Sequence, residues 1–458
     1  MDNELIFPKG FLFGAATASF QIEGDRQGRG DCIWDDYCRR EGNILDGSDG
    51  DVACDHVNRY KEDVAIMKKM GLKAYRFSVS WPRVFPDDSG IPNEKGVKFY
   101  NDLINELIAN DIIPFITLFH WDMPSWVYRK GGWLNDEVPE IFGEYARFIA
   151  KTYGDRVKYF ITFNEPQSFL PAGHHSGRHA PGLKLDVKEW LRASHNFFRA
   201  HGYAVKAIRE AVPDAKTGIT MSTDADFPLT DSKEDIEAAT KSILTIKEDY
   251  YWHMSLRYWC DPIYLGEYPP EMYERFGDKM PVMSEDDRKL ISQPLDFIAQ
   301  NCYSASAIVS DGNGGFKVAK QPLGKMKNSL NWSVTPRAIW FVIKTLWERY
   351  KLPVYITENG ICCNDWICED GFVHDSYRID FYKKYLKNVR RAITEGADVR
   401  GFFAWSLMDN FEWGKGYSER FGLVYVDYAT QKRTLKDSAL FYKQLIYDNE
   451  KIYDNEKR

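Results

Sequence analysis

The sequence predicts a single α/β domain folded as a (β/α)8 barrel, with long loops at the carboxyl ends of its strands. Eight short apolar segments recur along the 458 residues, each followed by a polar loop and an amphipathic helical stretch. No Ser/Pro-rich linker or low-complexity block divides the chain. Eight βα units in one uninterrupted chain are typical of this barrel, which commonly exceeds the usual length of one domain.

The predicted strands are near-continuous apolar runs, as expected for parallel strands that are covered on both faces. They span Phe11–Ser19, Ala74–Trp81, Ile112–Trp121, Tyr159–Pro166, Lys216–Thr223, Phe297–Ser304, Pro353–Gly360 and Gly401–Asn410. An open doubly wound sheet is the alternative, and it would place a glycine-rich turn between its first strand and helix. The glycine-rich segments 24–30 and 312–315 do not join a strand to a helix at that spacing, so the TIM barrel is favoured.

Two helical stretches are the clearest. The stretch Thr335–Tyr350 has Thr335 as a candidate N-cap and Pro336 at the first helical position, and Pro353 stops it. The stretch after Asp375 repeats the pattern, with a stripe of apolar side chains at helical spacing.

Long connections are predicted after four strands, at about residues 22–57, 167–187, 305–334 and 361–374. All leave the carboxyl ends of strands, where barrel enzymes build their active sites. We expect the domain to cover residues 1–445. Beyond it the letters IYDNEK occur twice, at 446–451 and 452–457, and residues 446–458 are expected to be a frayed tail.

Composition excludes several function classes. A net charge of −7 and the lack of a basic run argue against nucleic-acid binding. No apolar stretch is long enough for a membrane span, and the N-terminal residues do not resemble a secretory signal, so a cytoplasmic protein is expected. Aromatic residues make up 15% of the chain, which indicates a large core or a pocket with flat apolar walls.

The eight cysteines are scattered, and no disulfide framework is expected at this length without a signal. Three of them, Cys362, Cys363 and Cys368, lie near His374. Adjacent cysteines fit zinc-ligand spacing poorly, so no metal site is predicted there.

Two predicted strands end in a glutamate beside an asparagine. The fourth gives Asn164 and Glu165, and the seventh gives Glu358 and Asn359. Either glutamate alone is more often a solvated loop carboxylate, but two in one barrel mouth form a pair. Paired carboxylates suit glycoside hydrolysis, with retention at a separation of roughly 5–5.5 Å and inversion at roughly 6.5–9.5 Å. The sequence leaves that separation open.

Polar and aromatic residues end the other strands too. They are Gln21, Glu23, Arg76, His120, Trp121, Asn301, Tyr303, Trp405, Glu412 and Trp413. Each has an ordinary explanation in core packing or an ion pair, and their joint placement at one barrel face is harder to explain by packing. A sugar presents several hydroxyls and an apolar ring face, and this set supplies bidentate polar groups and aromatic platforms. Beside Glu358, Arg76 would favour the ionised carboxylate.

Longer motifs resemble the family 1 glycoside hydrolases, the β-glucosidase family. They include TFNEP at 162–166, ITENG at 356–360, LMDNFEW at 407–413, FLFGAATASFQIEG at 11–24, YRFSVSWPRVFP at 75–86, HWDMP at 120–124, HAPG at 179–182 and RFGLVYVDY at 420–428. The resemblance runs in order from about residue 7 to residue 443.

The resemblance implies a barrel that hydrolyses β-glycosides with retention and needs no metal or organic cofactor. It implies Glu165 as acid/base and Glu358 as nucleophile, with Asn164 holding the sugar 2-hydroxyl and Arg76 and Tyr303 flanking the nucleophile. Candidates for binding the sugar are Gln21, His120, Trp121, Asn301, Trp405, Glu412 and Trp413, and Trp332 would stack under the leaving group.

Two positions narrow the range of substrates that the resemblance implies. Glu165 stands where the plant thioglucosidase branch has glutamine, so O-glycosides are expected. Glu412 stands where phospho-sugar relatives carry a small residue, and a carboxylate there would repel a 6-phosphate. The expected partners are therefore unphosphorylated β-glucosides or oligosaccharides such as cellobiose, with β-galactosides and β-fucosides open.

Departures from the family pattern leave the aglycone preference open. They are residues 123–126 (MPSW), Ser222 and residues 172–178. A 6-phospho-β-glucosidase, a transglycosylase and a non-catalytic carbohydrate-binding protein stay as alternatives, and the oligomeric state is left open.

Overall fold

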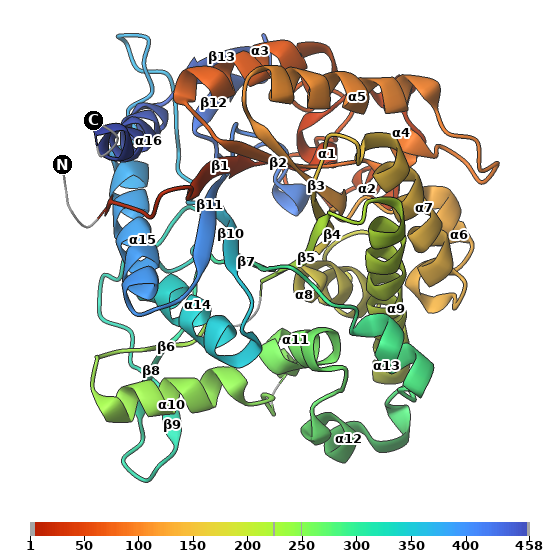
Figure 1. Cartoon of the computed structure of the whole chain (residues 1–458), viewed down its shortest axis with the longest axis vertical. Helices are drawn as coiled ribbons and strands as arrows, with labels where there is room; N and C mark the ends of the chain where they lie inside the picture. Colours follow the sequence, from red (N-terminus) through yellow and green to blue (C-terminus); the bar gives the residue numbers. More distant parts are fainter. Residues whose placement is uncertain (1–4, 223–224, 249, 456–458) are drawn as a thin grey trace.

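The structure, a computed structural model, describes residues 5–222, 225–248 and 250–455. Eight parallel strands close a barrel in the order β1-β11-β10-β7-β5-β4-β3-β2, and each strand pairs with the next barrel strand along the chain (Figure 1). The barrel strands are β1 (Leu12–Ala16), β2 (Ala74–Ser78), β3 (Ile113–Phe119), β4 (Tyr159–Asn164), β5 (Lys216–Met221), β7 (Ile298–Asn301), β10 (Val354–Asn359) and β11 (Val399–Trp405). The predicted barrel is confirmed.

Most predicted strands extend past the observed carboxyl ends. The first, for example, ends at Ala16, and Ser19–Ile22 forms the short helix α1. The last begins at Val399, two residues before its predicted start. Thr223, the predicted end of the fifth strand, lies outside the described residues. Most of the extra residues are buried although they lie outside the barrel strands.

Long helices cover the outside of the barrel (Figure 1). They are α3 (His56–Met70), α5 (Glu94–Ala109), α7 (Val138–Tyr153), α9 (Val187–Ala211), α14 (Arg337–Tyr350), α15 (Ser376–Thr394) and α16 (Asp437–Asn455). Four shorter helices follow β5, namely α10 (Lys233–Leu244), α11 (Leu256–Leu265), α12 (Pro270–Phe276) and α13 (Glu285–Ile291). Loops at the strand ends carry α2 (Ile33–Cys38), α4 (Trp81–Val84), α6 (Ser125–Arg129) and α8 (Pro166–Leu170).

The long loops leave the carboxyl ends of the strands, as predicted. Two further long connections were not expected, after β5 and after β11. They contribute parts of two small sheets, one formed by β6 (Phe227–Pro228), β8 (Ala307–Ser310) and β9 (Phe316–Val318), the other by β12 (Val424–Asp427) and β13 (Lys432–Leu435). Within the described ranges, no helix combines the length and apolarity that crossing a membrane requires.

Both clear helices are present, but the predicted N-cap of α14 is wrong. Pro336 occupies the cap position, and no side chain caps the helix. Thr335 instead ties two elements together, because its Oγ1 accepts from the amide of Ala305 at 3.1 Å and its own amide donates to the Tyr385 hydroxyl at 3.0 Å. The Thr335 hydroxyl, which the local pattern predicts as the helix cap, therefore makes a tertiary hydrogen bond instead.

The predicted frayed tail is also wrong for the residues described, since α16 runs through the first IYDNEK copy and into the second, as far as Asn455. Ile446 is buried, and the Asn449 side chain accepts from the Phe7 amide and donates to the Leu5 carbonyl. From the second copy, Tyr453 donates to the Phe7 carbonyl. Residues 446, 449 and 453 share one face of a helix with 3.6 residues per turn, so the duplicated segment still offers one packing face. Residues 456–458 lie outside the described residues.

Aromatic side chains fill the lower part of the barrel. Phe115 stacks on Tyr159 at 4.1 Å between ring centroids and meets Phe403 edge-on at 5.0 Å. Gly14 of β1 makes room for this packing, because a Cβ there would lie 2.5 Å from the Phe403 ring. The barrel floor is therefore solid, and the polar strand ends stand above it.

Candidate active site

A cavity of about 750 Å³ opens at the carboxyl ends of the barrel strands. Its walls include most of the predicted site residues, namely His120, Trp121, Asn164, Glu165, Asn301, Tyr303, Trp332, Glu358, Trp405, Glu412 and Trp413. Arg76 and Gln21 lie directly behind this wall and are fully buried. The barrel thus brings together residues that are up to 392 positions apart in the chain, from Gln21 to Trp413.

Glu358, near the end of β10, accepts hydrogen bonds on both carboxyl oxygens. Arg76 Nη1 donates to Oε1 at 2.5 Å and the Tyr303 hydroxyl donates to Oε2 at 2.7 Å. Burial raises the pKa of Glu358 to about 7; Arg76 opposes this rise, and the charge of Glu165 adds to it. A guanidinium and a phenol facing one carboxyl group favour its ionised form.

Glu165 follows the last residue of β4 in the left-handed conformation, with φ at 49°. Its Oε1 accepts from Asn301 Nδ2 at 2.7 Å and its Oε2 accepts from the Ser168 hydroxyl at 2.8 Å. Burial raises its pKa, against the hydrogen bonds from these two donors. Burial is the main cause of the rise, and a raised pKa suits a group that must carry a proton.

A chain of hydrogen bonds joins the two carboxyl groups. Arg76, which holds Glu358, also donates from Nη2 to Asn164 Oδ1 at 2.7 Å. Asn301, which holds Glu165, donates to the same Oδ1 at 3.1 Å. Both glutamates are therefore positioned against one rigid cluster, and their titrations are coupled.

The same cluster fixes the protonation of His120. Because Asn164 Oδ1 faces two donors, Asn164 Nδ2 is the atom 2.9 Å from His120 Nε2, and it donates to that nitrogen. Burial and the charge of Arg76 lower the pKa of His120 well below its usual value, so the ring is neutral. Its proton is then on Nδ1, which is buried without a protein partner among the described residues.

Tryptophans form two unlike sides of the cavity. Trp405 lies parallel to the His120 ring at 5.8 Å, and Trp413 packs on Trp121 at 4.6 Å. Trp332 instead lies beside Tyr303, with ring centroids 5.7 Å apart, and is 39% exposed. The cavity therefore has a buried aromatic end and an open one.

Two polar groups remain available at the buried end. Gln21 Nε2 donates to Asn410 Oδ1 and the Phe411 carbonyl, while its Oε1 is buried without a partner among the described residues. Within the described part of the chain, the Glu412 side chain makes no hydrogen bond. Burial raises its pKa to about 8, with the charges of Glu358, Glu419 and Glu165 adding to the rise.

One residue predicted at the site lies outside the cavity wall, and several residues of the wall were not predicted from the sequence. Glu23 pairs with Arg83 at 2.7 Å and accepts from the Tyr100 hydroxyl at 2.6 Å, outside the cavity wall. Ser168 was not predicted as a site residue. A hydroxyl three residues after Glu165 could have indicated it, because a helical turn brings these two side chains together. Loops add further wall residues that no strand-end pattern marks, among them Asn43, Arg178, Met254, Leu330 and Lys415.

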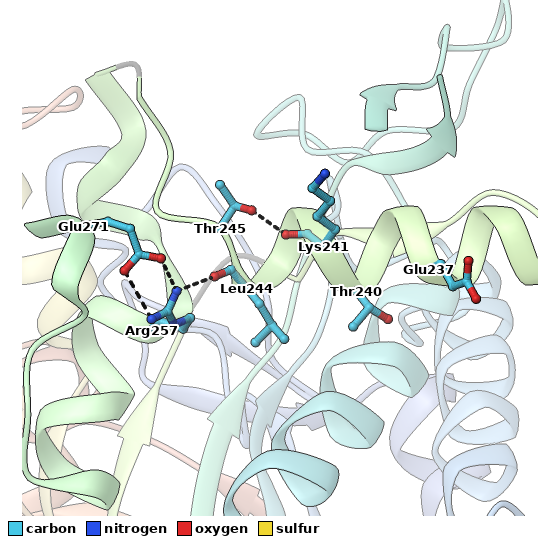
Figure 2. Close-up of a pocket in the computed structure, with 7 residues that line it drawn as sticks. All are labelled: Glu237, Thr240, Lys241, Leu244, Thr245, Arg257 and Glu271. Carbon is cyan, nitrogen blue, oxygen red and sulfur yellow. Dashed lines mark hydrogen bonds and ion pairs between the residues drawn. The ribbon is translucent and has the colours of Figure 1, made fainter. Parts of the chain in front are cut away.

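Two other places in the molecule lack the features of an active site. His374, near the three clustered cysteines, already has both ring nitrogens hydrogen-bonded, to Asp437 and to Asp370. A hollow of about 400 Å³ between α10, α11 and α12 is drawn in Figure 2. There Arg257 donates hydrogen bonds to Glu271 and to the Leu244 carbonyl. This hollow therefore lacks the converging polar groups of the barrel cavity.

Known proteins match this chain over nearly its full length. The profile of Glycosyl hydrolase family 1 matches residues 3–451. The chain belongs to this family. It is 44% identical over 448 residues to Beta-glucosidase A of Thermotoga maritima, covering 97% of this chain and 98% of that protein. It is 42% identical to Beta-glucosidase A of Acetivibrio thermocellus over 98% of this chain and 99% of that protein.

Solved family members share the whole fold. The family 1 β-glucosidase from T. maritima matches with a TM-score of 0.88 at 42% identity, covering 98% of this chain and 99% of that chain. A β-glucosidase from the same organism in complex with deoxynojirimycin matches with a TM-score of 0.87 at 43% identity, over 97% and 99% of the two chains. The resemblance drawn from the motifs is therefore confirmed at the level of the family and the fold.

Proposed function

We propose that the protein is a retaining β-glycosidase that hydrolyses unphosphorylated β-glucosides. The observation that carries this proposal is the pair of buried carboxyl groups in one cavity with unlike hydrogen-bond partners. Glu358 faces a guanidinium and a phenol, whereas Glu165 faces an amide and an alcohol. Relatives named β-glucosidases over nearly the full chain support the reaction class.

In the first step Glu358 attacks the anomeric carbon while Glu165 protonates the departing oxygen. The bond between the anomeric carbon and the glycosidic oxygen breaks, an ester to Glu358 forms, and the aglycone leaves as an alcohol. Arg76 and Tyr303 favour this assignment because they stabilise the charge that a nucleophile needs.

In the second step Glu165, now a carboxylate, removes a proton from water, and the water displaces Glu358 from the sugar. Esterified Glu358 carries no charge, so the pKa of Glu165 falls in the intermediate and the carboxylate form is favoured. Two inversions give net retention of configuration.

The buried end of the cavity is suited to the non-reducing sugar. Gln21 Oε1 can accept from a sugar hydroxyl, His120 Nδ1–H can donate to one, and the Trp405 and Trp413 rings offer apolar faces. Glu412 adds a carboxyl group whose ionised form, favoured above its raised pKa of about 8, repels a 6-phosphate. Glucosides are proposed as the main substrates, with galactosides and fucosides as secondary ones.

The test is hydrolysis of aryl β-glucosides, followed by ¹H NMR of the first product formed. We expect β-glucose to appear first and to mutarotate later; first appearance of α-glucose would overturn the retaining mechanism. Cellobiose and its 6-phosphate should be compared in parallel. Faster turnover of the phosphate would overturn the proposed role of Glu412 and favour a 6-phospho-β-glucosidase.

For cellular location we propose the cytoplasm, because all eight cysteines are free thiols, as is usual in a reducing compartment. Cell fractionation with an antibody against the chain tests this, and recovery outside the cytoplasmic fraction would contradict it.

A further inference from the structure

Ser168 contacts the proposed acid/base through a local turn. Glu165 ends the strand region with a left-handed backbone, and Pro166 begins α8. The Ser168 amide donates to the Glu165 carbonyl at 3.0 Å, which closes the first turn of the helix. This turn brings Ser168 Oγ to 2.8 Å from Glu165 Oε2.

The other oxygen of Glu165 faces a donor that cannot reverse its role. Asn301 Nδ2 donates to Oε1, and the orientation of this amide is fixed because Asn301 Oδ1 accepts from the Thr357 hydroxyl at 2.8 Å. A proton on Oε1 would point at an N–H group. The exchangeable proton of Glu165 therefore belongs on Oε2, the oxygen that Ser168 touches.

We propose that Ser168 is a positioning residue for Glu165, holding Oε2 and favouring the carboxylate form by donating its hydroxyl hydrogen. This inference rests on the proposed function. In the described part of the chain, the Ser168 hydroxyl donates one hydrogen bond, the one to Glu165. Removing this hydroxyl therefore breaks no hydrogen bond to the backbone. A hydroxyl that donates to the charged form lowers the pKa at which Glu165 changes from acid to base.

Several charged or titratable groups surround Glu165 from other elements. Arg76 comes from β2, His120 from the end of β3, Tyr303 from the loop after β7, Glu358 from β10 and Glu412 from the loop after β11. The exposed residues Arg178 and Lys415 line the same cavity, as do the ring of His179, which packs against Trp121, and the buried thiol of Cys302. The hydroxyl of Ser222 also faces Glu165, with an effect of the same sign as that of Ser168. All of these stay in place when the Ser168 hydroxyl alone is removed.

The test measures kcat/KM against pH for the unmodified chain and the Ser168→Ala variant, on an aryl β-glucoside with a poor leaving group. The basic limb reports loss of the acid proton from Glu165. We expect Ser168→Ala to raise the apparent pKa of this limb by about half a unit to one unit. The reason is that the net free energy of one hydrogen bond corresponds to roughly a shift of that size. The acidic limb, which reports Glu358, should move less.

Two further variants separate positioning from packing. Ser168→Thr keeps the hydroxyl and should restore the basic limb, while Ser168→Cys, with its weaker S–H donor, should give an intermediate position. Ser304→Ala removes an exposed hydroxyl from the same cavity wall and should leave the basic limb in place.

Three results are decisive. A graded shift in the order Ser, Cys, Ala supports the proposal, and an unshifted basic limb in an active Ser168→Ala variant overturns it. If Ser168→Ala lost its fold, the intermediate Ser168→Cys limb would decide alone. Failure of the proposed function is distinguishable, because the unmodified chain would then not hydrolyse the glucoside.

Discussion

The two ends of the cavity are built in different ways. At the buried end, Trp405 and Trp413 are 4% and 5% exposed, and the polar groups behind them are cross-linked between strands that lie far apart in sequence. At the open end, Trp332 is 39% exposed and sits on the loop between β7 and α14, and the exposed cations Arg178 and Lys415 line the opening.

This difference separates two kinds of selectivity. A buried polar group that finds no partner destabilises a complex strongly, so the buried end can distinguish one sugar from another. An exposed aromatic ring on a loop contributes contact area with little geometric demand. We therefore expect changes at the buried end to reduce catalysis on every substrate, and changes at the open end to alter only the preference for the aglycone.

The largest effect is expected from Glu358→Ala, which removes the proposed nucleophile from the cavity wall. Turnover should fall by at least about 10⁴-fold, since no covalent intermediate can form. Added azide should restore activity with activated aryl glucosides and give an α-glycosyl azide, identified by NMR. A β-configured azide product would contradict the assignment, and Glu419→Ala serves as a control at a carboxylate that does not line the cavity.

Glu165→Gln is expected to have the next largest effect. Activity on substrates with poor leaving groups should fall by about 10²- to 10⁴-fold, and the basic limb of kcat/KM should vanish because glutamine has no proton to lose in this range. The acidic limb should move downward, because Glu165 contributes to the raised pKa of Glu358, about 7. A variant profile that kept its basic limb would remove Glu165 from this role.

Gln21→Ala tests the buried end. It removes the acceptor Oε1 and the bonds to Asn410 and Phe411, so kcat/KM should fall by about 10- to 100-fold for glucosides with any aglycone. Steady-state kinetics on several aglycones checks this, with Gln293→Ala, away from the cavity wall, as the control. A loss confined to one aglycone would contradict the division of the cavity.

Trp332→Ala tests the open end and should have the smallest effect. We expect KM for aryl glucosides to rise by about 2- to 10-fold, with the preference for glucose over galactose unchanged. Trp366→Ala, which removes an exposed tryptophan that does not line the cavity, is the matched control. A changed sugar preference in the Trp332 variant would show that the open end also selects the sugar.

Local pattern was sufficient for some parts of this protein and insufficient for others. The barrel strands were visible because a buried parallel strand has an apolar run whatever its partners are. Glu165 and Glu358 were visible because each follows such a run directly. Glu23 also follows a strand, yet it binds Arg83 and Tyr100, and only the folded chain distinguishes this carboxylate from the other two.

The missed features depend on contacts between distant segments. The repeated sequence at the C-terminus predicted a frayed tail. In the structure Ile446 is buried, and Asn449 and Tyr453 form hydrogen bonds with Phe7 of the N-terminal segment. Thr335 is a residue type that often caps helices, but its hydroxyl accepts a hydrogen bond from the amide of Ala305 in a loop. Neither partner is near in sequence.

The sequence by itself determined the barrel, the two glutamates and the family, because apolar periodicity and long contiguous motifs are local properties of the chain. The tertiary structure alone decided which oxygen of each glutamate meets which donor, that one Asn164 oxygen links Arg76 to Asn301, and that Ser168 touches the acid/base. These contacts set pKa values and proton positions through burial and hydrogen bonding, and both depend on distances in space that a linear pattern does not contain.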